Sequence, residues 1–206
     1  MSREKHFMIL TVVFPHLQRA QWDRIDKEFK DVEYEIIIQR DIQKAVEEAR
    51  GRFILFLEED CAFAEGELAE SLNIFLDNSS YRKLAMVASA VDFDSLDEPI
   101  RFSTDDGKLS YSPVSGDSRY PVQIGYLYGS IIRTSAIKNI VLAKRKDTIY
   151  RSVQLSDFFW STGLRIEMNP MSVYYAPAEE NHIPSDIYKF KASSEALKVW
   201  NKEFIP

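Results

Sequence analysis

The chain has 206 residues, a length that suits one α/β domain or two small ones. Hydrophobic residues make up 45% and charged residues 28%, close to the average of globular proteins, which excludes wholesale disorder. The formal net charge is −6, from 26 Lys and Arg against 32 Asp and Glu. A general nucleic-acid-binding protein is therefore not expected, because duplex binding needs a basic face.

The longest strongly apolar stretch, residues 7–14, is too short to cross a bilayer, and no small-residue cleavage site follows it. We therefore expect neither a transmembrane segment nor a secretory signal. The single cysteine, Cys61, cannot form an internal disulfide, which fits a reducing cytosol. We expect a cytoplasmic protein, and peripheral contact with the inner face of a membrane stays open as an alternative.

The first half of the chain alternates between strand and helix patterns. Strands are expected at residues 7–14, 34–38, 53–57 and 84–91, and helices at 22–29, 42–49 and 68–76. Asp41 is a candidate N-cap of the second helix, and Gly51 is a candidate terminator. This βαβαβαβ order predicts a parallel, doubly wound α/β sheet.

The second half is more varied. A hairpin is expected around Asp106-Gly107, followed by a strand at 129–133 and a short helix at 136–141 that Thr134 caps. The remaining expected elements are a helix at 155–162, short strands at 164–168 and 172–175, and a C-terminal helix at 194–204. No linker or repeat interrupts the chain, so a single domain is expected.

Three carboxylates, Glu58, Glu59 and Asp60, follow the apolar strand 53–57 directly. Open parallel sheets bind ligands at the carboxyl ends of their strands. Glu58 and Asp60 are two residues apart, so on an extended backbone both can face one side, and such hard oxygen ligands suit Mg²⁺ or Mn²⁺. A solvated strand exit that caps the next helix is the alternative interpretation of this cluster.

The stretch 45–60 resembles family 2 glycosyltransferases of the GT-A fold, in which a helix ending Ala-x-Gly leads into an apolar strand that ends in Asp-x-Asp. Three later segments agree with that family in order: 125–136, 156–167, and 173–177 followed by His182. The resemblance implies a GT-A-like α/β fold with a mostly parallel sheet, helices on both faces and a small antiparallel hairpin. Residues 1–92 would then form the nucleotide-sugar-binding half, 93–183 the acceptor half and 184–206 a C-terminal helix.

The resemblance also implies an activity: metal-dependent transfer of a sugar from a nucleotide-diphosphate donor to a glycan or other hydroxyl acceptor, with inversion. By position, Glu58, Asp60 and His182 would bind Mn²⁺ or Mg²⁺, and Asp157 would be the general base. Contacts to the donor would come from four residues, Pro15, Asp41, Glu59 and Asp60.

Each of these roles has a structural alternative. Asp157 can be a helix cap, and His182, in a polar loop, can be a solvated side chain. The chain also departs from the family pattern: a helix and a strand are missing between residues 38 and 42, and Ser156 stands where the family has a Glu. A catalytically degenerate GT-A-like module with a binding or scaffold role therefore remains the second hypothesis.

Overall fold

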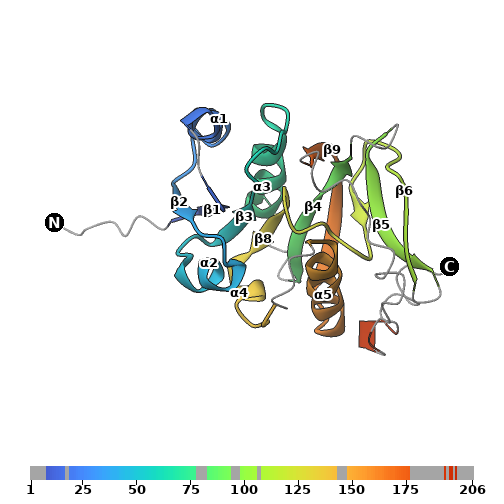
Figure 1. Cartoon of the computed structure of the whole chain (residues 1–206). Coiled ribbons are helices and arrows are strands. Elements are labelled where there is room, and N and C mark those ends of the chain that lie inside the picture. Colours follow the sequence, from blue (N-terminus) through green and yellow to red (C-terminus); the bar gives the residue numbers. More distant parts are fainter. Residues whose placement is uncertain are drawn as a thin grey trace.

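The computed structural model describes residues 8–16, 19–77, 83–93, 98–105, 108–142, 148–176, 193, 195–196 and 198. Within these residues, one sheet of nine strands has helices packed on both of its faces (Figure 1). The expected α/β class is confirmed. His182 and most of the expected C-terminal helix lie outside the described residues.

Five strands share one direction: β1 (Leu10–Phe14), β2 (Tyr34–Ile38), β3 (Phe53–Phe56), β4 (Leu84–Asp92) and β9 (Arg165–Tyr175). β1 is parallel to both of its neighbours, and Val13 lies beside Ile37 in β2 and Phe56 in β3. The short β8 (Ile131–Arg133) runs antiparallel between β3 and β4. The C-terminal ends of the five strands therefore gather at one edge of the sheet, which we call the carboxyl edge.

The expected hairpin is confirmed as β5 (Ile100–Asp105) and β6 (Lys108–Pro113), which pair antiparallel and extend the sheet beyond β4. A two-residue strand, β7 (Tyr120–Pro121), pairs with β9. The two short strands expected at 164–168 and 172–175 are one strand, β9. Its pairing with β4 shifts register between Asn169 and Val173, so a local irregularity interrupts the ladder without ending the strand.

Alternate residues of each central strand face opposite layers, as strand geometry requires. On one face, α1 (Arg19–Glu28) and α3 (Glu67–Asp77) pack on Leu10, Val12 and Leu55. On the other face, α2 (Ile42–Glu48), α4 (Thr134–Ile137) and α5 (Thr148–Ser161) bury Val13, Ile54 and Phe56. These two apolar layers form the core.

Two helix predictions need correction. The helix expected at 155–162 begins seven residues earlier, at Thr148, so Asp157 lies inside α5 and not near its start. Ile149 and Val153 are buried in the core and extend the apolar pattern back through this first part of the helix. The helix expected at 136–141 is α4, which begins at Thr134 itself and ends at Ile137.

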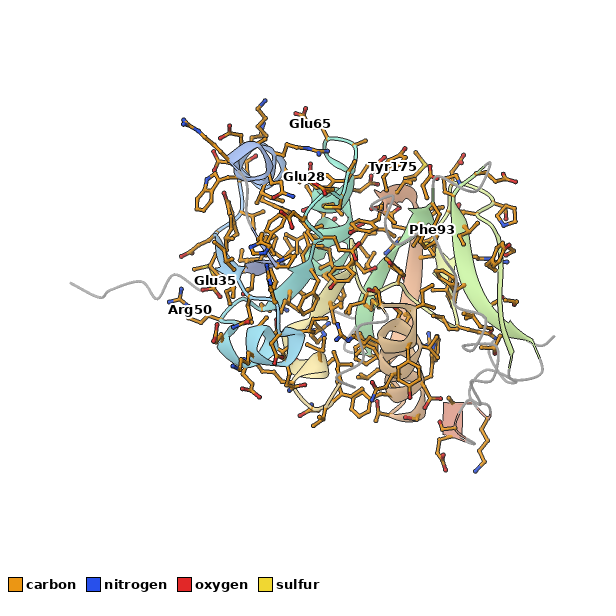
Figure 2. The ribbon with its side chains drawn as sticks, viewed as in Figure 1. Glu28, Glu35, Arg50, Glu65, Phe93 and Tyr175 are labelled. Atoms are coloured by element: carbon orange, nitrogen blue, oxygen red, sulfur yellow. The ribbon has the colours of Figure 1, made fainter. Side chains whose placement is uncertain are left out.

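The turn between α2 and β3 is fixed by a buried hydroxyl. Thr11 Oγ1 accepts a hydrogen bond from the Gly51 backbone N–H at 2.8 Å and donates one to Glu35 at 2.7 Å. Glu35 also accepts from the Arg50 backbone N–H at 2.7 Å, and Figure 2 shows the Glu35 and Arg50 side chains side by side. A Cβ atom on Gly51 would lie 2.5 Å from the Thr11 backbone nitrogen, so this turn requires glycine.

Replacement of Gly51 by alanine should destabilise the protein by about 3 kcal/mol, because the added methyl group meets backbone that cannot move aside. Urea unfolding followed by circular dichroism measures the loss. Gly116→Ala is the control, since a Cβ there meets nothing within 4 Å although its φ is 79°; it should cost about 1 kcal/mol. A Gly51→Ala variant no less stable than the control would contradict this account of the turn.

Candidate functional site

The three carboxylates expected at the end of the third strand form a turn at the carboxyl edge, which we call the acidic turn (Glu58, Glu59 and Asp60). β3 ends at Phe56, and Leu57 N–H still donates to the Val13 carbonyl of β1 at 2.9 Å. Glu58 is only 7% exposed, Glu59 is half-buried and Asp60 is exposed. The two acids of the expected metal-binding pair are therefore in different environments.

Glu58 has a partner deep in the protein. The hydroxyl of Tyr174, near the end of β9, donates to Glu58 Oε2 at 2.6 Å. Tyr174 is fully buried, and this burial, with the nearby Cys61 and Glu58, raises its pKa well above the usual value of a tyrosine. Burial and then the charge of Glu58 raise the pKa of the Cys61 thiol to about 12. The hydroxyl of Tyr174 therefore remains a proton donor to Glu58 at neutral pH.

A second contact ties the segment after the acidic turn to β9. The backbones of Ala62 and Tyr175 exchange two hydrogen bonds, at 2.9 and 3.2 Å, as an isolated antiparallel bridge. Tyr175 marks the end of β9 at the carboxyl edge in Figure 2. The acidic turn is therefore held from β9 by a side chain and by the backbone.

The end of β1 lies next to the acidic turn, and the end of β2 lies one strand further away. Gln39 N–H donates to the Phe14 carbonyl at 2.8 Å, and the Arg40 guanidinium contacts the His16 ring. β1 lies between β2 and β3, so the C-terminal ends of β2 and β3 are two strand spacings, or about 10 Å, apart. Pro15 and Asp41, both expected as donor contacts, therefore share the carboxyl edge with Glu58, Glu59 and Asp60.

Asp41 caps α2, as expected from the sequence. Its Oδ1 accepts from the backbone N–H groups of Gln43 at 3.0 Å and Lys44 at 3.2 Å. Asp41 also lines a cavity of about 570 Å³ together with other residues at the start of α2, with Val141 and Leu142 after α4, and with Arg151 of α5. That volume is in the range of small-molecule sites in proteins.

Among the described residues, three cationic side chains line this cavity, Arg40, Lys44 and Arg151, together with the acids Asp41 and Glu47. Guanidinium groups bind phosphate oxygens with two parallel hydrogen bonds, so the cavity is suited to a phosphate-bearing ligand. Sequence reasoning missed these three residues. The sequence could have indicated Arg151 if the helix that carries it had been expected to begin at Thr148, where α5 begins, and not at residue 155.

Asp157 is placed differently from the other described candidates. It lies on α5 six residues after Arg151, about 9 Å further along the helix axis. Its Oδ1 accepts from the Ser193 backbone N–H at 2.8 Å. α5 ends where β9 begins, and Arg165 N–H bonds the Lys83 carbonyl at the start of β4. Asp157 therefore lies toward the amino ends of the strands, and in Figure 1 α5 lies beside the lower part of the sheet, away from the end of β9.

Metal binding by Glu58, Asp60 and His182 stays a prediction. Among the described residues, no group of three His, Cys, Asp or Glu side chains is arranged to hold a metal ion, and His182 lies outside them. Within the described part of the chain, no helix is both long enough and apolar enough to span a membrane.

No family model and no curated protein sequence matches this chain. Solved structures do resemble it. A197 from STIV has a TM-score of 0.52 at 18% identity, over 84% of this chain and 87% of that one. GalNAc-T7 with UDP, GalNAc and Mn²⁺ has a TM-score of 0.53 at 13% identity; the match covers 96% of this chain and about half, 47%, of GalNAc-T7. The fold of this chain is therefore GT-A-like, as the sequence analysis expected.

The burial of Cys61 makes its reactivity a test of the packing around the acidic turn. With a pKa of about 12, the native thiol is ionised about 1,000-fold less at pH 8 than a thiol with the ordinary value of 9.0. Alkylation by iodoacetamide should therefore be slower in the native protein than in urea by roughly this factor. Cys61 is the only cysteine, so mass spectrometry reports on it alone. Similar rates in both states would show that the Cys61 thiol is not buried in the folded protein.

Proposed function

We propose that this protein is a metal-dependent glycosyltransferase that moves a sugar from a nucleotide-diphosphate donor to the hydroxyl of a glycan or glycoconjugate, with inversion. The observation that carries the proposal is the acidic turn at the carboxyl edge of a GT-A-like sheet, together with a cavity at the start of α2 that Arg40, Lys44 and Arg151 line. Carboxylates and cations at one edge match the two kinds of charge in a complex of a diphosphate with a divalent metal.

The residues present fit a hard divalent cation such as Mn²⁺ or Mg²⁺, because the acidic turn offers carboxylate oxygens. Asp60 is exposed and would be the main ligand, with Glu58 beside it and His182 as a further ligand. The metal, when bound, would offset the charge that develops on the leaving diphosphate. Support for this choice of ions comes from GalNAc-T7, which was solved with UDP, GalNAc and Mn²⁺.

The nucleotide would lie along the ends of β1 and β2. Pro15, Asp41 and Glu59 are the proposed contacts, and Asp41 also lines the 570 Å³ cavity. There, Arg40 and Arg151 would bind phosphate oxygens of the donor. In this arrangement α2 and α5 hold the nucleotide from one side, and the acidic turn holds the metal from the other.

A second candidate function is a GT-A-like module that binds a nucleotide without transferring a sugar. One observation favours it: the carboxylate of Asp157, the expected general base, accepts a hydrogen bond from Ser193 and lies toward the amino ends of the strands. A general base must reach the proton of the acceptor hydroxyl, directly or through one water molecule. The two candidates therefore differ in turnover and agree in donor binding.

Asp60→Ala should abolish metal-dependent donor binding. In a thermal-shift panel of UDP, GDP and TDP with Mn²⁺, a ligand at 100 times its Kd adds about 2.7 kcal/mol to the stability of the wild type. For a chain of this size, this corresponds to a rise in Tm of roughly 5–10 °C. The rise should disappear in Asp60→Ala and without Mn²⁺, and persist in the control Asp23→Ala, an exposed acid on α1. An equal rise in Asp60→Ala would refute the metal site.

Asp157→Asn tests the general base. An amide oxygen can still accept the hydrogen bond from Ser193, so folding and UDP binding should be unchanged. If Asp157 is the base, release of UDP from a UDP-sugar, with water or a glycan as acceptor, should fall by about 10²–10⁴-fold. Undiminished release would exclude Asp157 as the base. A wild type that binds UDP with Mn²⁺ but releases none from any UDP-sugar would favour the binding module.

A further inference from the structure

The side chain of Tyr174 is held on several sides. Gly129 has a φ of 71°, and a Cβ atom there would lie 2.4 Å from Cδ2 of the Tyr174 ring. The centroid of the Tyr126 ring lies 5.9 Å from the centroid of the Tyr174 ring. The Tyr174 ring is fully buried among these neighbours, and such packing holds the position of its hydroxyl.

The backbone around this ring is fixed as well, and by groups that belong to the carboxyl edge. Gly129 N–H donates to the Phe56 carbonyl at 2.9 Å, at the last residue of β3 before the acidic turn. The Gly129 carbonyl accepts from the Ser89 hydroxyl at 2.6 Å, and the hydroxyls of Ser89 and Ser172 are 2.7 Å apart. β3, β4 and β9 therefore share one buried network around Tyr174.

We propose that Tyr174 is a positioning residue for the metal site: its hydroxyl orients the Glu58 carboxylate toward the cation held with Asp60. This inference rests on the proposed function. Tyr174 binds one carboxylate oxygen, Oε2, at 2.6 Å, which limits the rotation of a side chain that is longer than an aspartate. Groups that hydrogen-bond a ligating carboxylate commonly set metal affinity, and their loss weakens binding 10–100-fold.

The test is the Mn²⁺ affinity of the whole chain, measured by calorimetry with and without UDP. In Tyr174→Phe the Kd for Mn²⁺ should rise about 10-fold. Tyr34→Phe is the matched control, because it also removes a hydroxyl that donates to a carboxylate, Asp26, at 2.9 Å. Tyr34 is the first residue of β2 and lies at the amino ends of the strands, away from the carboxyl edge. Its replacement should therefore leave the Kd for Mn²⁺ unchanged.

A double-mutant cycle separates positioning from a general loss of packing. If Tyr174 acts through Glu58, Tyr174→Phe should not change the Mn²⁺ affinity further in a Glu58→Gln background. An equal loss in both backgrounds, or a wild-type Kd in Tyr174→Phe, would overturn the inference. Should Tyr174→Phe fail to fold, Glu58→Asp replaces it, because the shorter side chain cannot reach the Tyr174 hydroxyl; a wild-type Kd in that variant would also overturn the inference.

The same titrations tell failure of this inference from failure of the proposed function. Wild-type protein that binds Mn²⁺ through Asp60, with no effect of Tyr174→Phe, refutes the role of Tyr174 alone. If the wild type binds no Mn²⁺, or if Asp60→Ala binds Mn²⁺ as tightly as the wild type, both the metal site and the positioning role are refuted.

Discussion

The common direction of β1, β2, β3, β4 and β9 is the constraint on which the candidate site depends. Parallel strands end at the same edge, so residues that follow different strands come together without being close in the sequence. Two strand spacings separate the chain leaving β2 from the chain leaving β3. Pro15, Asp41, the acidic turn and the end of β9 therefore lie at one edge of the sheet.

Within that region the two acids of the expected pair have different physical tasks. Burial of a carboxylate is costly unless hydrogen bonds compensate it, and Glu58 is compensated by the Tyr174 hydroxyl. Asp60 is exposed and therefore open to water, and to the cation of the proposed function. A site with one buried, oriented carboxylate and one exposed carboxylate is preorganised on its inner side and accessible on its outer side. Arg40, Lys44 and Arg151 give the cavity at the start of α2 positive charge, which suits the diphosphate of the proposed donor.

Much of this architecture could be predicted from the sequence, and the exceptions have physical causes. β2 was expected at its observed bounds, and Asp41 caps α2 as its residue type indicates. The antiparallel direction of β8 had no sequence signal, because an apolar run buried on both faces has the same pattern in either direction. The start of α5 was placed too late because its first turns, Thr148 to Gln154, mix β-branched, aromatic and polar residues. That error made Asp157 look like a residue at a helix start.

At the acidic turn, the sequence predicts which side chains are present but not how deeply each one is buried. The pattern of Glu58 and Asp60 correctly indicated carboxylates at the end of β3, but residue spacing could not show that one is buried and the other exposed. Tyr174, which donates to Glu58, is 116 residues away in the chain, and the pairing of β4 with β9 and the bridge between Ala62 and Tyr175 bring it there. Arg151 reaches the cavity in the same way, through the tertiary packing of α5.

Paramagnetic broadening of amide resonances by Mn²⁺ in the presence of UDP tests the central claim most directly, because it locates the cation without assuming a ligand set. The account predicts the strongest broadening at Glu59, Asp60 and Cys61, weaker broadening at Asp41, and the least within this set at Thr162 and Gly163 beyond the end of α5. Broadening centred on another acidic surface, or none at the acidic turn, would contradict it.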